Sequence, residues 1–226
     1  MKTLLHFAVV LLFAGAGHAQ VVDRMVAVVN KQVIMESELD QAARVECLLQ
    51  GKPIEKLTPA DRNAVLERLI DRALLDQQIA NPALLDPTPI ELAARIKEVR
   101  ADMPQARTDE GWNAVLAGYG ISEQDLEDQL TAQSRILRFI DLRFRGIVRV
   151  EKDAIADYYQ KSFLPEVHKR NAPEPKLAEV SDKIEQILAE QQIDSLLTNW
   201  LKTLRAQAHI ERMLPETPPA NVGAEP

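Results

Sequence analysis

The stretch between Arg24 and Asp40 constrains the fold more than any other part of the chain. Its sequence, RMVAVVNKQVIMESELD, places two apolar runs rich in β-branched residues on either side of Asn30 and Lys31. Such runs around a short polar pair predict a β-hairpin, and Asn30 is of a type that tolerates positive φ. A two-stranded hairpin is only marginally stable in water. We therefore expect it to pack against helices or against a further strand.

Most of the chain after this hairpin has the spacing of amphipathic helices. Ser37, Thr58, Thr88 and Ser122 each precede such a pattern and are predicted to be N-caps, with Pro59 in the first turn of the second helix. The predicted helices span residues 37–50, 58–79, 88–101, 109–117, 122–145, 151–162 and 177–208. The short alternating stretch 209–213 follows the last helix and is predicted to pair with the hairpin as an edge strand.

These patterns predict a mainly α fold. It is a multi-helix core with a small β-sheet that joins the N- and C-terminal segments. The helix at 122–145 is expected to pack against the core through one apolar face. The residues predicted for that face are Leu126, Leu130, Leu137, Ile140 and Phe144.

The two ends of the chain differ from the helical middle. Residues 1–19 carry Lys2, an apolar run and small residues ending at Ala19, which is typical of a cleavable secretory signal peptide. The run is shorter than the roughly 20 apolar residues of a membrane span, so a retained anchor is the less favoured alternative. Residues 214–226 are rich in proline and predicted to be disordered. In a bacterium the exported protein is expected in the periplasm, without a stable membrane anchor.

Composition excludes several classes of function. The chain has 27 Lys and Arg against 34 Asp and Glu, a net charge of −7, which argues against nucleic acid as a partner. Cys47 is the only cysteine and is predicted to be a small buried side chain, so no intramolecular disulfide forms. No zinc-ligand spacing, phosphate-binding loop or catalytic constellation occurs, and we expect no metal, cofactor or catalytic residues.

The order of these segments resembles the SurA-like group of periplasmic chaperones. The resemblance is carried by VDRMVAVVNKQVIMESELD at 22–40, LERLIDRALLDQQI at 66–79, the turn at 119–122 and WLKTLRAQAHIE at 200–211. It covers nearly all of the chain after the signal peptide. It implies an N-terminal chaperone domain at 20–163, completed by a C-terminal helix and strand at 177–213.

Members of that group typically carry one or two parvulin-type prolyl isomerase domains before the C-terminal helix. In this chain only residues 164–176 occupy that position, and they are predicted to form a tether in place of such a domain. A parvulin domain needs far more residues to bury a core. The parvulin histidines are also missing, since only His168 and His209 follow the signal peptide. We therefore expect no enzymatic activity.

The resemblance implies binding of unfolded polypeptides. We expect an ATP-independent chaperone for unfolded outer-membrane proteins, with apolar surface left in a groove between the long helix and the N-terminal helices. A degenerate prolyl isomerase and a dedicated envelope-assembly subunit are the alternatives, and client identity and oligomeric state are left open. For each candidate residue, core packing is the competing role. The candidate peptide-binding residues are Met103, Trp112, Tyr119, Phe139, Tyr158, Tyr159 and Phe163.

Overall fold

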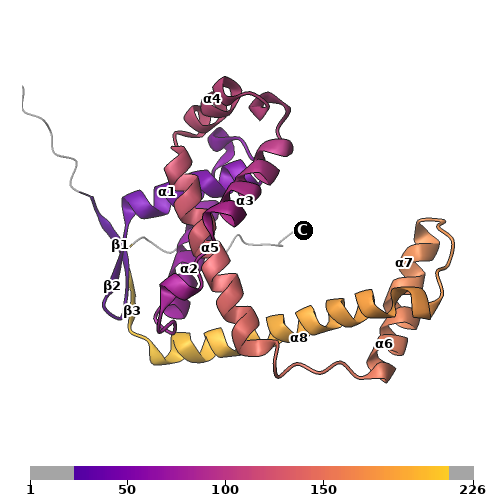
Figure 1. The fold of residues 1–226 in the computed structure, drawn as a ribbon. Coiled ribbons are helices and arrows are strands. Elements are labelled where there is room, and N and C mark those ends of the chain that lie inside the picture. Colours follow the sequence, from indigo (N-terminus) through magenta and orange to yellow (C-terminus); the bar gives the residue numbers. More distant parts are fainter. Residues whose placement is uncertain (1–22, 214–226) are drawn as a thin grey trace, which may run out of the picture.

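The computed structural model describes residues 23–213, a helical body from which one long helix extends to a smaller distal lobe (Figure 1). The predicted signal peptide at 1–19 and the tail at 214–226 lie outside the described residues. The fold is mainly α with a small sheet, as predicted. The strands are β1 (Met25–Val29), β2 (Gln32–Met35) and β3 (Ile210–Arg212). The α-helices are α1 (Glu36–Leu49), α2 (Pro59–Asp76), α3 (Pro89–Ala101), α4 (Asp109–Tyr119), α5 (Glu123–Phe144), α6 (Lys152–Tyr158), α7 (Leu164–Lys169) and α8 (Leu177–Gln207).

The predicted hairpin is confirmed, and the C-terminal strand joins it. Asn30 sits in the turn with φ of 58°. The strand order is β2-β1-β3, with both pairings antiparallel. The side chain of Asn30 links three segments, because its Oδ1 accepts from the backbone N of His209 at 2.9 Å and its Nδ2 donates to Gln77 at 2.7 Å. The chain therefore returns to its N-terminal segment, as predicted.

Three of the four predicted helix caps are confirmed. Thr58, Thr88 and Ser122 each form a capping box with an acid three residues later. Ser37 is not an N-cap, because α1 begins one residue earlier, at Glu36. The backbone N–H of Ser37 instead donates to Asp23 Oδ1 at 3.1 Å, so the carboxylate of Asp23 satisfies a free amide at this helix start.

The body contains two hydrophobic clusters, and α1 contributes to both. Its first half, with Leu39 and Ala43, packs with the sheet and α2. Its second half, with Val45 and Leu48, packs with α3, α4 and the start of α5. Cys47 is buried, as predicted. Helix α1 thus connects the sheet to the helical head formed by α3, α4 and the start of α5.

Helix α8 is held against α2 by charged side chains near its C-terminal end. Arg205 donates to Asp71 at 2.6 Å and to Glu67 at 2.7 Å, and Arg212 on β3 donates to Glu67 at 2.8 Å. Hydrogen bonds from Arg212 and Arg205 hold the pKa of Glu67 below its usual value, although partial burial opposes this. These contacts anchor one end of the 31-residue helix α8 to the body.

The segment predicted to be a tether, residues 164–176, is partly helical. Helix α6 passes through a π-helical turn at Tyr159–Phe163 directly into α7, so only the residues between Lys169 and Leu177 form a loop. Together, α6, the π-turn, α7 and the first turns of α8 form the distal lobe, in which Ile155 and Ile184 are buried. The helix was missed because Pro165 lies in the first turn of α7, where proline is tolerated.

One predicted core position of α5 is wrong. Leu126, Leu130 and Phe144 are buried as expected, but Leu137 is 67% exposed. Its helical spacing is that of a core residue, yet within residues 23–213 its side chain lies between α2 and α8 and neither helix covers it. Within residues 23–213, no helix is both long enough and apolar enough to cross a membrane.

We predict that Arg205→Ala will lower the free energy of unfolding by about 1–3 kcal/mol, because it leaves Glu67 and Asp71 without their shared donor. Urea denaturation of the purified protein measures this. The matched control is Arg95→Ala, whose pair with Glu98 is more than half exposed on both sides and should contribute less than about 0.5 kcal/mol. Equal losses in the two variants would contradict the anchoring role of Arg205.

Candidate functional site

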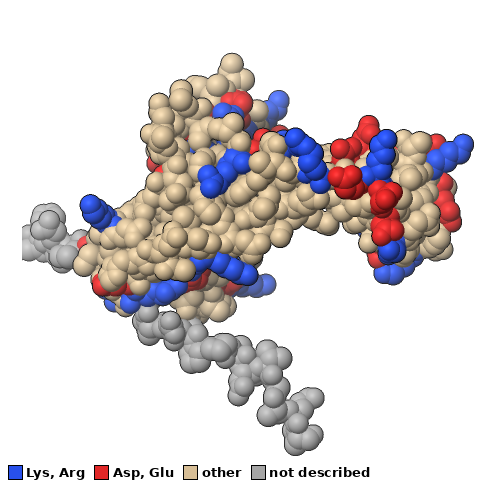
Figure 2. All heavy atoms as spheres, turned by 90° about the horizontal axis from the view of Figure 1, so that it is seen from below, with Lys and Arg blue, Asp and Glu red and all other residues tan. Residues whose placement is uncertain are grey.

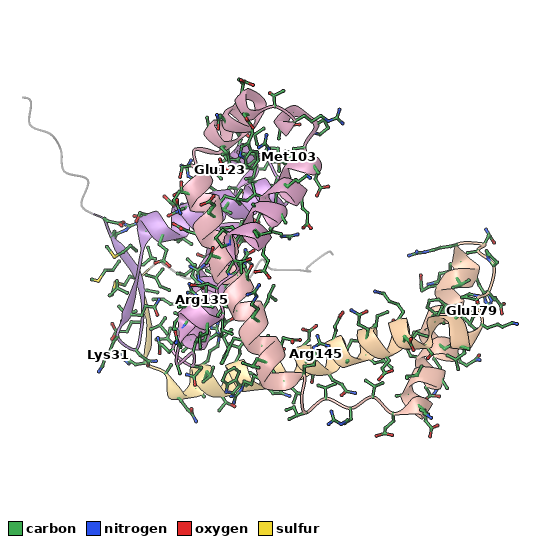
Figure 3. All side chains as sticks on the ribbon, in the orientation of Figure 1. Lys31, Met103, Glu123, Arg135, Arg145 and Glu179 are labelled. Atoms are coloured by element: carbon green, nitrogen blue, oxygen red, sulfur yellow. The ribbon has the colours of Figure 1, made fainter. Side chains whose placement is uncertain are left out.

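The seven candidate residues lie in three separate parts of the molecule. Met103, Trp112 and Tyr119 belong to the hydrophobic cluster of the head. Trp112 is 1% exposed, so its side chain is a core residue. Met103 and Tyr119 are partly buried against the same cluster, and Figure 3 labels Met103 in the head. All three side chains therefore pack in or against the hydrophobic cluster of the head.

Phe139 lies where α5 crosses α8. Its ring centroid is 5.9 Å from that of Trp200, and the ring of Phe144 meets Trp200 edge-on at 5.7 Å. The guanidinium of Arg143 sits 3.9 Å from the centroid of the Trp200 ring. This aromatic junction, made of Phe139, Phe144 and Trp200, holds the two helices together through ring contacts.

Tyr158, Tyr159 and Phe163 lie in the distal lobe and are each partly buried. Tyr159 and Phe163 stack with centroids 5.9 Å apart. The hydroxyl of Tyr159 donates to the backbone oxygen of Pro175 at 2.7 Å, which ties the π-turn to the loop before α8. Tyr159 therefore has a structural partner, while Tyr158 and Phe163 keep part of their surface exposed.

An apolar groove runs between α5 and α8, beside the aromatic junction. It has a volume of about 630 Å³. Its lining includes large aliphatic side chains from both helices and from the loop before α3. The aliphatic lining residues are Leu85, Leu137, Ile140, Leu142, Ile193 and Leu197. We call this the α5–α8 groove.

A second groove of about 340 Å³ lies on the other side of α5, against α2. Its aliphatic lining comes from Leu69, Leu75, Ile136 and Leu137. Leu137 lines both grooves, so the two meet at this side chain. The larger hollow between α3 and α5, of about 860 Å³, has only Leu92 and Ile96 as large aliphatic lining residues. The two grooves that meet at Leu137 therefore have more large aliphatic lining residues than this hollow.

Charged side chains surround the α5–α8 groove and brace its walls. Arg145, at the end of α5 near α8, pairs with Asp141 (Figure 3). Arg138 donates to the backbone oxygen of Asp86 at 3.0 Å and to Glu91 at 2.6 Å. Arg135 donates to Asp86 at 2.7 Å. These bonds fasten the start of α3 to the middle of α5 and so fix the loop that carries Leu85.

Glu91, which Arg138 joins to α5, has a lowered pKa. The hydrogen bond from Arg138, with those from the backbone and side chain of Thr88, holds the pKa of Glu91 at about 2. On the face seen from below, charge is unevenly distributed. From below, charged side chains gather over the distal lobe, and a broad uncharged band crosses the body (Figure 2).

The arrangement is suited to binding. Within residues 23–213, His, Cys, Asp and Glu side chains do not gather into a group that could hold a metal ion. The site is a shallow apolar surface with a charged rim. Such a surface can bind an extended apolar segment without catalysing a reaction. Leu137 was missed as a site residue because its helical spacing is that of a core residue, and Leu142 because it lies off the apolar face predicted for α5.

Two comparisons with known proteins bear on this site. A family model described as a SurA-like N-terminal domain matches residues 1–138, which include β1, β2 and α1 to most of α5. The search of curated proteins gives no match. The matched region contains the whole lining of the groove between α2 and α5. Of the α5–α8 groove it contains only Leu85, Leu137 and Arg138, because the end of α5 and all of α8 lie beyond residue 138.

We predict that the double substitution Leu137→Ser and Leu142→Ser will lower binding of the apolar dye 1-anilinonaphthalene-8-sulfonate severalfold. The two side chains are 67% and 75% exposed, so stability should change by less than about 1 kcal/mol. Fluorescence titration measures dye binding. Ile90→Ser is the matched control, because Ile90 is 82% exposed and lines neither groove. An equal loss in the control would show that the dye does not report on the grooves.

We predict that Glu91→Gln will reduce the acid sensitivity of folding. The folded-state pKa of Glu91, about 2, is below its usual 4.5, so its stabilising effect is complete above pH 4.5 and is lost as the pH falls toward 2. The urea midpoint of the variant should therefore lie below that of the wild type at pH 7, and the difference should shrink at pH 3. A difference that is constant with pH would contradict this role.

Proposed function

We propose, because the chain belongs to the SurA-like N-terminal domain family, that it is an ATP-independent periplasmic chaperone that binds unfolded outer-membrane proteins. The family is of the chaperone type, and the class of client is our inference. The observation that carries the proposal is the pair of apolar grooves that meet at Leu137, a side chain that is 67% exposed. Exposed apolar patches of this kind mark interaction sites.

The shape of the grooves favours extended segments. They lie on both sides of α5, so one strand-like segment can contact both through Leu137. Strands of outer-membrane barrels alternate apolar and polar residues over about ten positions. Such a segment can place its apolar side chains in shallow grooves and leave its polar side chains in water. The match in chemistry supports this class of client.

Weak binding is the expected regime. Aliphatic contacts in open grooves contribute modestly to the free energy of binding. The conformational entropy lost when an unfolded segment becomes ordered offsets much of that contribution. Release then follows when the client folds or inserts elsewhere, without nucleotide. The partly exposed rings of Tyr158 and Phe163 in the distal lobe remain proposed contacts for a longer client.

No enzymatic activity is part of the proposal. The family match comprises the N-terminal domain. Between α6 and α8 the chain forms the π-turn, α7 and a short loop, which pack as part of the distal lobe. We propose that this lobe extends the binding surface, in the place where related chaperones carry isomerase domains.

We predict that the protein without its signal peptide will suppress aggregation of a urea-denatured porin at a near-equimolar ratio and without nucleotide. Light scattering after dilution measures this. The Leu137→Ser and Leu142→Ser variant should need several times more protein for the same effect, whereas Ile90→Ser should match the wild type. A proline isomerisation assay on the same preparation should show no acceleration.

Three results would contradict the proposal. Wild-type protein that leaves porin aggregation unchanged would rule out a general chaperone and favour a dedicated envelope-assembly subunit. Full suppression by the groove variant would place client binding elsewhere on the molecule. Acceleration of proline isomerisation would show an enzyme instead.

A further inference from the structure

Strand β2 forms an edge of the sheet. The order β2-β1-β3 leaves the outer side of β2 without a partner among residues 23–213. The hydrogen-bond pattern shows which groups face that side. Asn30 N donates to His209 O, and Met213 N donates to Val26 O, so the even-numbered residues of β1 bond to β3.

Ala27 and Val29 of β1 therefore bond to β2, and the register shifts between Ala27 and Met25. Ala27 pairs with Ile34 and Val29 with Gln32, while Val28 lies opposite Val33. Bonded and non-bonded pairs alternate in an antiparallel ladder, so the backbone N–H and C=O of Val33 point away from β1, toward the free edge. The edge thus offers one donor and one acceptor to an incoming strand.

The outer face of the sheet is apolar beside this edge. Val28 and Val33 are opposite each other, as are Met25 and Met35, and Met213 follows two residues after Glu211, the partner of Val28. Paired residues share a face, and so do residues two apart. Met25, Val33 and Met213 are 45%, 40% and 46% exposed.

Methionine dominates this surface. Three of the five methionines of the chain, Met25, Met35 and Met213, lie on it. Methionine is unbranched and polarizable, so a surface rich in it adapts to different partner side chains. Strand β2 itself, Gln32–Met35, carries no charge that would repel an apolar strand. We call this face, with the free edge of β2, the strand site.

We propose that the strand site binds an extended, uncharged segment of an unfolded client as a fourth strand beside β2. The inference rests on the proposed chaperone function and adds a second site to it, on the opposite end of α1 from the head. The client's backbone bonds to Val33, and its apolar side chains contact Val33, Met25 and Met35.

The short length of the β2 edge favours a client segment over a second copy of this protein as the bound strand. Strand β2 has four residues, a length of about 13 Å, and pairing along it buries far less than the roughly 1,000 Å² of a stable protein interface. Pairing of two copies through β2 would therefore not give a stable dimer. Weak, reversible pairing with a segment that binds again elsewhere on the protein is what this edge supports.

Val33→Pro tests the proposal, because proline removes the outward N–H while the bonds of Gln32 and Ile34 to β1 remain. The probe is a fluorescein-labelled peptide of about ten residues that alternates Val and Thr. Its affinity, measured by fluorescence anisotropy, should fall about tenfold. Val33→Thr, which keeps the backbone donor and the side-chain shape, is the matched control and should lose less than about threefold.

Hydrogen exchange of the wild-type protein gives a measurement that does not depend on folding of a variant. Saturation with the peptide should slow exchange of the Val33 amide at least about tenfold and leave that of Ile34, already bonded to β1, unchanged. Unchanged exchange at Val33 overturns the proposal, as does wild-type affinity in Val33→Pro. A dimer of the wild type that Val33→Pro dissociates also overturns it, because the occupant would be a second copy.

The test of the strand site and the test of the proposed chaperone function can give independent results. If wild-type protein suppresses porin aggregation but Val33 shows no protection, the strand site fails and the chaperone function stands. If Val33 is protected by the peptide but aggregation is not suppressed, the strand site stands as a peptide-binding edge and the general chaperone function fails.

Discussion

The pairing of β3 with β1 is the contact on which the rest of the structure depends. It joins Asn30 to His209, 179 residues apart in the chain. Closing so large a loop costs conformational entropy, which the buried sheet and the ion pairs of Arg205 and Arg212 with Glu67 offset. Because this end of α8 is fixed, the rest of the helix points away from the body and carries the distal lobe (Figure 1).

The same constraint creates the grooves. Helix α8 touches α5 near Trp200 and then diverges from it, so the C-terminal half of α5 is covered on one side only. Leu137 and Leu142 remain exposed as a result. In a globular bundle a further helix would cover them. Here α8 is anchored at one end and leaves this apolar surface exposed. The loss of folding stability is small, because neither Leu137 nor Leu142 belongs to a buried cluster.

The proposed function and the proposed strand site together would combine two kinds of recognition in one chain. The α5–α8 groove offers aliphatic contacts without backbone hydrogen bonds, while the edge of β2 offers backbone hydrogen bonds beside methionine side chains. Neither selects a defined sequence. A single client chain that binds at both sites would bind more tightly than at either site alone. Once one segment is bound, binding of the second segment is effectively intramolecular. Weak individual sites are then compatible with retention of a long unfolded chain.

Local sequence by itself determined the hairpin, three helix caps, most helix boundaries and the short alternating stretch that forms β3. These features depend on neighbouring residues, as in the capping box of Thr88, or on a short alternating pattern. Only the tertiary structure decided which apolar residues are covered. Trp112 and Leu137 have similar helical patterns, yet one is 1% and the other 67% exposed. Exposure depends on which element packs over a helix face, and that is set by contacts distant in the sequence.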